Sequence, residues 1–310
     1  AQSLRLMEVR HELVRDGDRP LVLAIGFFDG FHRGHREIAR QTLQLRKPRW
    51  RSGVLTFASH PAAHLRPGTE PPLISTPQER LDLFAAAGFE ECFFVNFDDR
   101  IATLTPEAFL NILVERLGVH AVVVGSTFRF GHRRAGDVRL MREYLTSRGV
   151  GGTFVDPVRE GGERISSTRI RALIGGGDVA QADRLLGGTG YELRGPVEIG
   201  VGRGHTLGFP TANLRVPAKL LPKDGVYSAV ARYDGRDYPS LVSIGNNPHF
   251  GGNERTVEAW LRDFQATIYG RELALRDLRY VREQRLFGET SELVKQMQLD
   301  LQTIGFPAYG

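Results

Sequence analysis

The sequence predicts two domains of the α/β plus β class. Residues 1–186 are expected to form a parallel sheet covered by helices, and residues 187–310 an antiparallel β-barrel with a terminal helix. A length of 310 residues suits two separate cores. In the first part, short apolar runs alternate with helical periodicities, which indicates βαβ units. After a glycine-rich break at residues 187–190, short alternating strands follow one another, which indicates an all-β domain.

The first domain contains five apolar runs with the length of buried strands. They are residues 21–25, 53–57, 92–97, 120–124 and 152–156. Helical periodicity separates them, in the segment after residue 35 and over residues 77–87, 106–117 and 138–147. Thr105 and Pro106 supply an N-cap and a first-turn proline for one of these helices. Ligands of parallel sheets bind at the carboxyl ends of the strands, so the loops after the strands are expected to hold the chemistry.

The most informative loop is the decapeptide that starts at Gly26 and joins the first strand to the first helix. With Gly30 and Gly34, it lets the backbone curve closely around a ligand. The amino end of the following helix offers N–H groups and a positive dipole end to an anion. His32 and His35 are one helical turn apart, so both could reach that anion. The pattern predicts a phosphate-binding turn that lacks the lysine of a P-loop.

Two further loops of this domain contain residues suited to a ligand. After the fourth strand, Phe128 and Phe130 either line a pocket for a flat ring or fill the core. Later in the chain, Ser167, Thr168 and Arg169 stand at the start of a helix. They either cap that helix or bind a polyphosphate, for which arginine supplies planar, charge-assisted donors.

The decapeptide, GFFDGFHRGH, resembles the GxFDGxHxGH signature of the HxGH-type nucleotidyltransferases and is most similar to the bacterial bifunctional riboflavin kinase/FAD synthetase family. Residues 165–171, ISSTRIR, are similar to the ISSTxIR signature of the same enzymes. The resemblance implies a Rossmann-like domain in which a phosphate oxygen of FMN attacks the α-phosphorus of ATP, so that FAD forms and pyrophosphate leaves.

The resemblance also implies roles for individual residues of the first domain. His32, His35 and Arg169 are expected to act in catalysis on the phosphates. The residues expected to bind ATP or its phosphates are Gly26, Phe28, Asp29, Gly34, Ser167 and Thr168, and those expected to bind flavin are Phe128 and Phe130. Asp29 could equally hold the turn, and His60, in a segment similar to TFxPHP, could be a site residue or cap a turn. Thr127 stands where the family has Asp or Asn, which motivates the alternative of a kinase whose first domain has lost most of its activity.

In the second domain, residues 227–233 and 238–244 flank Asp234-Gly235, which is the strongest hairpin signal in the chain. Residues 256–261 and 272–281 continue the strand pattern. Three apolar residues recur at four-residue intervals near the end of the chain and predict a helix that packs on the barrel: Leu293, Met297 and Leu301.

Residues 200–214 resemble the flavokinase signature, a glycine loop followed by GFPTANL. The resemblance implies that Gly202, Gly204 and Thr211 bind ATP. It also implies that Thr211 and Asn213 hold Mg²⁺, a hard cation that prefers oxygen ligands.

Residues 256–264 are similar to the family's VExHLxDF strand. Glu258 is there the expected base, which takes the proton of the ribityl 5′-hydroxyl as that oxygen attacks the γ-phosphoryl group of ATP. Its alternation with apolar neighbours would by itself indicate only a solvent-facing strand residue. Arg282 and Phe287, in a segment similar to RxExxF, are expected to contact the isoalloxazine.

Composition is ordinary for a globular enzyme, with 41% apolar and 25% charged residues. The net charge of +5 could suggest a nucleic-acid partner, but no basic run is present. Cys92 is the only cysteine and lies in an apolar run, so we expect a buried thiol and a reducing compartment. No apolar run is long enough to span a membrane. We therefore expect a cytoplasmic monomer or weak oligomer with small-molecule partners, namely riboflavin, FMN and ATP with Mg²⁺. The alternative from another class is a regulatory module that binds flavin or nucleic acid.

Overall fold

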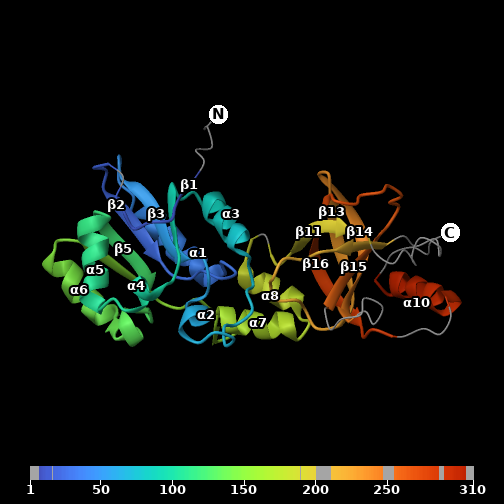
Figure 1. The fold of residues 1–310 in the computed structure, drawn as a ribbon. Helices are drawn as coiled ribbons and strands as arrows, with labels where there is room; N and C mark the ends of the chain where they lie inside the picture. The colour runs from blue at the N-terminus through green and yellow to red at the C-terminus, as the bar shows by residue number, and fades with distance from the viewer. Residues whose placement is uncertain are drawn as a thin grey trace. The chain divides into compact units, whose positions relative to one another are not determined.

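The computed structural model describes residues 7–15, 17–188, 190–199, 211–246, 255–285 and 290–304 (Figure 1). The chain divides into two compact units, Ala1–Ser167 and Thr168–Gly310. This division falls at the start of helix α7 (Ser167–Gly175), whereas the sequence places the domain boundary after residue 186, at the end of α8 (Val179–Leu186). The boundary at residue 186 stays a prediction.

The first unit is built on a six-stranded sheet in which every strand pair is parallel. In spatial order the strands are β1 (Glu8–Arg10), β4 (Glu91–Val95), β3 (Arg51–Phe57), β2 (Leu21–Ile25), β5 (Val119–Gly125) and β8 (Gly151–Val155). The five strands expected from the sequence are all present. Strand β1 adds an edge that the sequence analysis did not predict.

Apolar side chains fill both faces of this sheet. Leu21, Leu23 and Ile25 of β2 belong to one core cluster, and Val22 and Ala24 of the same strand belong to the other. A strand buried on both faces reads as a continuous apolar run, which is why these strands could be recognised in the sequence.

Helices cover the sheet on both sides (Figure 1). Those of the first unit are α1 (Arg33–Gln44), α2 (Pro61–Leu65), α3 (Pro77–Ala87), α4 (Asp99–Ala102), α5 (Pro106–Asn111) and α6 (Val138–Ser147). The helix expected over residues 106–117 begins as predicted, because Thr105 Oγ1 accepts a hydrogen bond from Ala108 N at 3.1 Å. Its second half, Ile112–Arg116, is wound as a π-helix. Cys92 is fully buried in the core, where burial raises the pKa of its thiol to about 12.

The second unit is a closed antiparallel barrel with helices α7, α8 and α10 (Thr290–Thr303). Around the barrel the strands are β11 (Leu193–Glu198), β12 (Thr211–Leu214), β15 (Arg255–Leu261), β14 (Arg236–Asn246), β13 (Gly225–Tyr233) and β16 (Glu272–Arg282). Asp234 and Gly235 both have positive φ, at 47° and 74°, as a two-residue type I′ hairpin requires.

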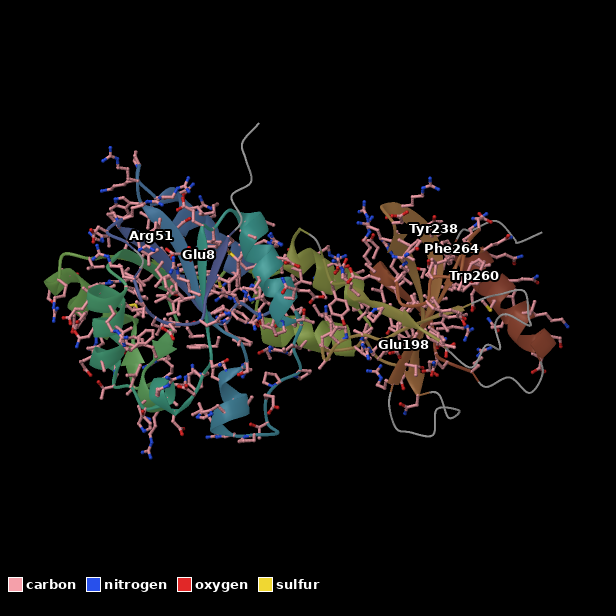
Figure 2. The ribbon with its side chains drawn as sticks, turned by 45° about the horizontal axis from the view of Figure 1, so that its top comes forward. Glu8, Arg51, Glu198, Tyr238, Trp260 and Phe264 are labelled. Atoms are coloured by element: carbon pink, nitrogen blue, oxygen red, sulfur yellow. The ribbon has the colours of Figure 1, made fainter. Side chains whose placement is uncertain are left out.

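Helix α10 packs on the outside of the barrel, as its four-residue periodicity predicted. Leu301 forms a buried cluster with Val226, Leu241 and Trp260, and Met297 packs against that cluster. Trp260 is labelled beside this helix in Figure 2. The alternate residues of the same strands, such as Val242 and Ala259, therefore point into the barrel, where they are completely buried.

Candidate functional site

A pocket of about 270 Å³ opens at the carboxyl ends of β2, β5 and β8. Strands β3 and β4 follow β2 on one side of it, and β5 and β8 lie on the other, so the order of the chain reverses between β2 and β5. Such a reversal leaves a crevice where ligands of open α/β sheets bind. The loops that the sequence singled out form the wall: the glycine turn after β2, the segment after β5 and residues 164–167.

His32 and His35 both line this pocket. His32 is the N-cap of α1, and its Nδ1 accepts a hydrogen bond from His35 N at 3.3 Å. The two imidazole rings are stacked, with centroids 3.6 Å apart. A Cβ at Gly34 would lie 3.1 Å from the His32 ring, so glycine at this position leaves room for the stack.

His35 is buried in an environment that disfavours a proton on its ring. Burial first, and then the charges of His32 and Arg164, hold the pKa of His35 well below its usual value of 6.5. Its Nδ1 is buried and has no hydrogen-bond partner among the described residues. Buried polar atoms are nearly always paired, so this unpaired nitrogen marks His35 as a candidate site residue.

Asp29 holds the turn in place. Its carboxylate accepts hydrogen bonds from Ile74 N at 3.1 Å and from Ser75 N at 2.9 Å. Its backbone oxygen accepts a bond of 2.9 Å from the hydroxyl of Ser167. The side chain is 1% exposed and is not among the residues that line the pocket. Of the two roles considered for Asp29, this geometry corresponds to holding the turn.

The two phenylalanines after β5 have different surroundings. Phe128 lines the pocket, together with the exposed Thr127. Phe130 is buried in the core, where its ring centroid lies 5.5 Å from that of Phe109 and 5.9 Å from that of Phe128. Only Phe128 is therefore placed to contact a ligand in this pocket directly.

Ser167 lines the pocket and is the first residue of α7, and Thr168 and Arg169 are the next two residues of that helix. Arg171 is one helical turn beyond Ser167, so these two residues share a side of α7, whereas Arg169 does not lie on that side. His60 caps α2, since its Nδ1 accepts from Ala62 N at 3.1 Å.

Arg164 is a pocket residue that the sequence analysis missed. It is exposed, lines the wall, and its charge lowers the pKa of His35. In the sequence it is marked only by its position directly before the ISSTRIR segment. Its proximity to His35 depends on the tertiary structure.

On the barrel, strand register brings three polar residues into one row. Asn213 of β12 and Ser243 of β14 are both directly opposite Glu258 of β15. Opposed residues of antiparallel strands point to the same face, here the outer face, because the neighbouring row contains Trp260 beneath α10. Thr211 is opposite Trp260 and shares this face. Ser243, which the sequence analysis missed, accepts a bond of 2.9 Å from the Gln284 amide.

The barrel row fits a magnesium ion. Asn213 Oδ1 is buried and has no hydrogen-bond partner in the described part of the chain, so an amide oxygen next to the carboxylate-bearing Glu258 lacks a donor there. Hard cations take such oxygens as ligands. No group of three His, Cys, Asp or Glu side chains in the described part of the chain could hold a metal. A small number of protein ligands is enough for Mg²⁺, which is commonly bound by one or two side chains together with substrate phosphates.

Three predicted residues, Gly202, Gly204 and Phe287, lie outside the described residues. Arg282 is held by a buried ion pair with Asp300 of α10. Its Nε and Nη2 lie 2.9 Å and 2.8 Å from the two carboxylate oxygens of that residue. This guanidinium fastens α10 to the barrel, and its contact with the isoalloxazine stays a prediction.

The switch-point pocket, with its histidine pair at a helix N-terminus, places the first unit in the class of α/β proteins that bind phosphate-bearing ligands at the carboxyl ends of their strands. The family model described as FAD synthetase matches residues 15–169, and the one described as riboflavin kinase matches residues 187–305. The chain therefore belongs to the family of bifunctional riboflavin kinases/FMN adenylyltransferases. This confirms the fold class and the pair of activities expected from the sequence.

Several relatives with that name align with nearly the whole chain. The protein of Listeria monocytogenes is 32% identical over 96% of both chains, and that of Escherichia coli K12 is 33% identical over 96% of both. A crystal structure of a macrolide-efflux protein from Streptococcus pneumoniae superposes with a TM-score of 0.85 at 29% identity, covering 96% of this chain and 98% of the other. Among the described residues, no helix is both long and apolar enough to cross a bilayer.

Proposed function

We propose that the two activities use the two sites described above. FMN is adenylylated in the pocket of the first unit, and riboflavin is phosphorylated on the outer row of the barrel. The observation that supports this proposal best is the convergence of His32, His35 and Ser167 on one switch-point pocket. The unpaired Asn213 Oδ1 beside Glu258 supports the second site.

In the first site, a phosphate oxygen of FMN displaces pyrophosphate from the α-phosphorus of ATP. No nucleophilic side chain is required, so the residues act by positioning and by neutralising charge. The amino end of α1, the two imidazoles and the backbone N–H of Ser167 at the start of α7 donate to phosphate oxygens, and Phe128 lies where it can contact a flat ring. His35 is neutral in the free protein and gains a proton only as the negative charge of the polyphosphate approaches.

In the second site, Glu258 takes the proton of the ribityl 5′-hydroxyl as this oxygen attacks the γ-phosphorus of ATP, and ADP leaves. Thr211 and Asn213 would hold Mg²⁺, and that ion would supply positive charge to the oxygens of the transferred phosphoryl group. The cross-strand pairing of Asn213 with Glu258 supports this proposal, because the metal ligand and the base would then be neighbours.

The assay that tests the proposal is separation of flavins by chromatography. With riboflavin, ATP and Mg²⁺ we expect FMN and then FAD, and with FMN supplied directly we expect FAD and pyrophosphate. FMN formation without FAD would instead establish the alternative of a kinase with an inactive first unit. When Mg²⁺ is left out and EDTA is added, we expect FMN formation to stop.

Thr127 gives this alternative a specific test, because it is exposed at the pocket wall in place of the Asp or Asn of the family. If Thr127 weakens adenylyl transfer, Thr127→Asn should raise the rate of FAD formation about tenfold, the value of one hydrogen bond to a charged group. FMN formation should not change. An Asn variant no faster than the natural chain would show that Thr127 does not limit the reaction.

We also propose a cytoplasmic location and small-molecule partners only. The single, buried cysteine supports a reducing compartment. The expectation of a monomer or weak oligomer, and of no nucleic-acid partner, stays a prediction.

A further inference from the structure

Arg80 is a fully buried arginine next to the glycine turn, and neither reaction as described above uses it. It lies on α3, and its relative exposure is 0%. No carboxylate of the described residues forms an ion pair with it. Burial lowers the pKa of this guanidinium, and the charge of Asp29 offsets only part of that effect. Burying the guanidinium is therefore costly, and its position needs an explanation.

The guanidinium of Arg80 donates mainly to backbone groups at the carboxyl ends of two strands, and Nη1 also lies 3.3 Å from the Thr56 hydroxyl. Nη1 donates to Phe27 O at 3.0 Å and to Phe57 O at 2.9 Å, and Nη2 donates to Ala58 O at 2.9 Å. The hydroxyl of Thr56 also donates to Phe27 O, at 3.0 Å. One side chain thus joins the turn after β2 to the end of β3, at a point where the strand ladder has ended.

The ring of Phe27 lies directly against this guanidinium. Its centroid is 4.5 Å from Arg80 Cζ, and the ring of Phe94 lies at 5.3 Å. Phe27 itself lines the pocket. Arg80 therefore fixes both the carbonyl and the ring of a pocket residue without reaching the pocket itself.

The same element holds the other side of the turn. The residues just before α3, Ile74 and Ser75, donate their backbone N–H groups to Asp29, and Ser75 Oγ accepts from Gly30 N at 3.1 Å. A capping box between Thr76 and Glu79 joins this segment rigidly to α3. Arg80 thus holds the turn at Phe27, and the contacts of Asp29 hold it two residues further on.

The turn requires these contacts because its backbone is strained. Phe28 and Phe31 have φ of 57° and 38°, in the left-handed region that side chains other than glycine rarely adopt. Strained conformations of this kind persist only where surrounding contacts over-determine them, and they occur preferentially at functional sites.

We propose that Arg80 is a positioning residue for adenylyl transfer, which acts through Phe27 to hold the nucleotide turn in its reactive geometry. This role rests on the proposed use of the switch-point pocket for adenylyl transfer. A misplacement of about 1 Å at the reacting groups lowers the rate about 100-fold. Since the barrel site is in the other unit, riboflavin phosphorylation by the same molecules provides an internal control.

The decisive variant is Arg80→Met, which keeps the volume of the stem but removes the guanidinium donors of Phe57 O and Ala58 O and leaves Phe27 O with the Thr56 hydroxyl as its donor. At a temperature well below its melting transition, we expect the turnover number for FAD formation per folded molecule to fall about 100-fold. We expect the KM for ATP to rise less than the turnover number falls, and FMN formation to stay unchanged. Arg139→Met, an exposed arginine on α6, is the matched control.

Arg80→Lys retains a buried cation with donors and should recover most of the lost rate. A purely structural role would lower the melting temperature without changing the rate per folded molecule. A folded Arg80→Met variant with a turnover number within threefold of the natural chain would therefore overturn the proposal.

Should the first unit of Arg80→Met fail to fold, judged by near-UV circular dichroism, Arg80→Ala with added ethylguanidinium decides the matter. The proposal requires that millimolar ethylguanidinium restores FAD formation and that ethylurea, which has a similar shape but no charge, does not. Absence of rescue, or equal rescue by both compounds, would contradict it.

Discussion

His35 combines burial with positive neighbours, and this decides how it meets a phosphate. Its ring is stacked on His32 and lies near Arg164, and both charges add to the effect of burial in lowering its pKa. The imidazole is therefore neutral at pH 7 in the free protein. The folded chain resists a proton that the unfolded chain accepts, so this group stabilises the fold above pH 6.5 and the contribution is lost as pH falls below that value.

Binding of a nucleotide should counteract the lowering of the pKa of His35. Binding of a non-hydrolysable ATP analogue is expected to raise the pKa of His35, because the polyphosphate brings negative charge next to the ring. Arg164→Gln is expected to raise it in the free protein, because a nearby positive charge is removed. The measurement is an NMR titration of histidine ring signals, with His120 at the other end of β5 as internal control. A pKa that the analogue leaves unchanged would show that the phosphates do not reach His35.

At the scale of elements, α8 is joined to the barrel through a buried carboxyl group. Asp183 accepts a hydrogen bond of 2.6 Å from Tyr191 N and thereby fixes the connection from α8 into the barrel. Burial is the largest cause and raises its pKa to about 6, opposed first by the hydrogen bond from Tyr191 N. The charge of Asp277 raises the pKa further by a smaller amount, and the charge of Arg279 lowers it slightly. A Cβ at Gly190 would lie 3.1 Å from this carboxylate, so the connection approaches it very closely.

This carboxyl group predicts a pH dependence of stability. Between pH 4 and pH 6 the folded state keeps a proton on Asp183 that the unfolded state has released, so stability falls as pH rises through this range. Asp183→Asn keeps the acceptor oxygen and removes the titration. We expect the variant to match the natural chain below pH 4 and to exceed it above pH 6, by up to about 3 kcal/mol. Urea unfolding at several pH values measures this, and a difference independent of pH would refute the assignment.

Helix α10 depends on a second buried contact between elements. Arg282 at the end of β16 forms its bidentate ion pair with Asp300, whose side chain is 4% exposed. The apolar side of the same helix covers Trp260 and Leu241. The row with Asn213 and Glu258 is next to Trp260 on the same face of the barrel. The ion pair therefore also holds the helix that borders the proposed kinase site.

For the whole molecule, the separation of the two sites into two compact units predicts independent losses of activity. Glu258→Gln is expected to lower FMN formation 10²- to 10⁴-fold, the usual contribution of a general base, and to leave FAD formation from supplied FMN unchanged. His32→Ala should do the reverse. Glu272→Gln, an exposed carboxylate on β16, serves as control for the first variant. Chromatography of the flavins gives both rates, and a variant in which both activities fell together would contradict two independent sites.

Local sequence was sufficient wherever one segment determines its own structure. Continuous apolar runs identified strands buried on both faces, Thr105 identified a helix start, and Asp234-Gly235 identified a hairpin. The decapeptide from Gly26 identified the pocket, because a strand, a glycine turn and a helix N-terminus are contiguous in the chain.

Other features came only with the tertiary structure, because they depend on residues far apart in sequence. The carboxylate of Asp29 meets backbone donors 45 and 46 residues away, and Arg80 meets a carbonyl 53 residues away. The row of Asn213, Glu258 and Ser243 depends on strand register, which no single strand specifies by itself. The sequence alone thus determined the two folds, since local periodicity and turn residues encode these, and the resemblance of its motifs to a known family indicated their chemistry. Which side chains hold the motifs in place was decided by packing, because burial gives a polar group its role only once its partners are known.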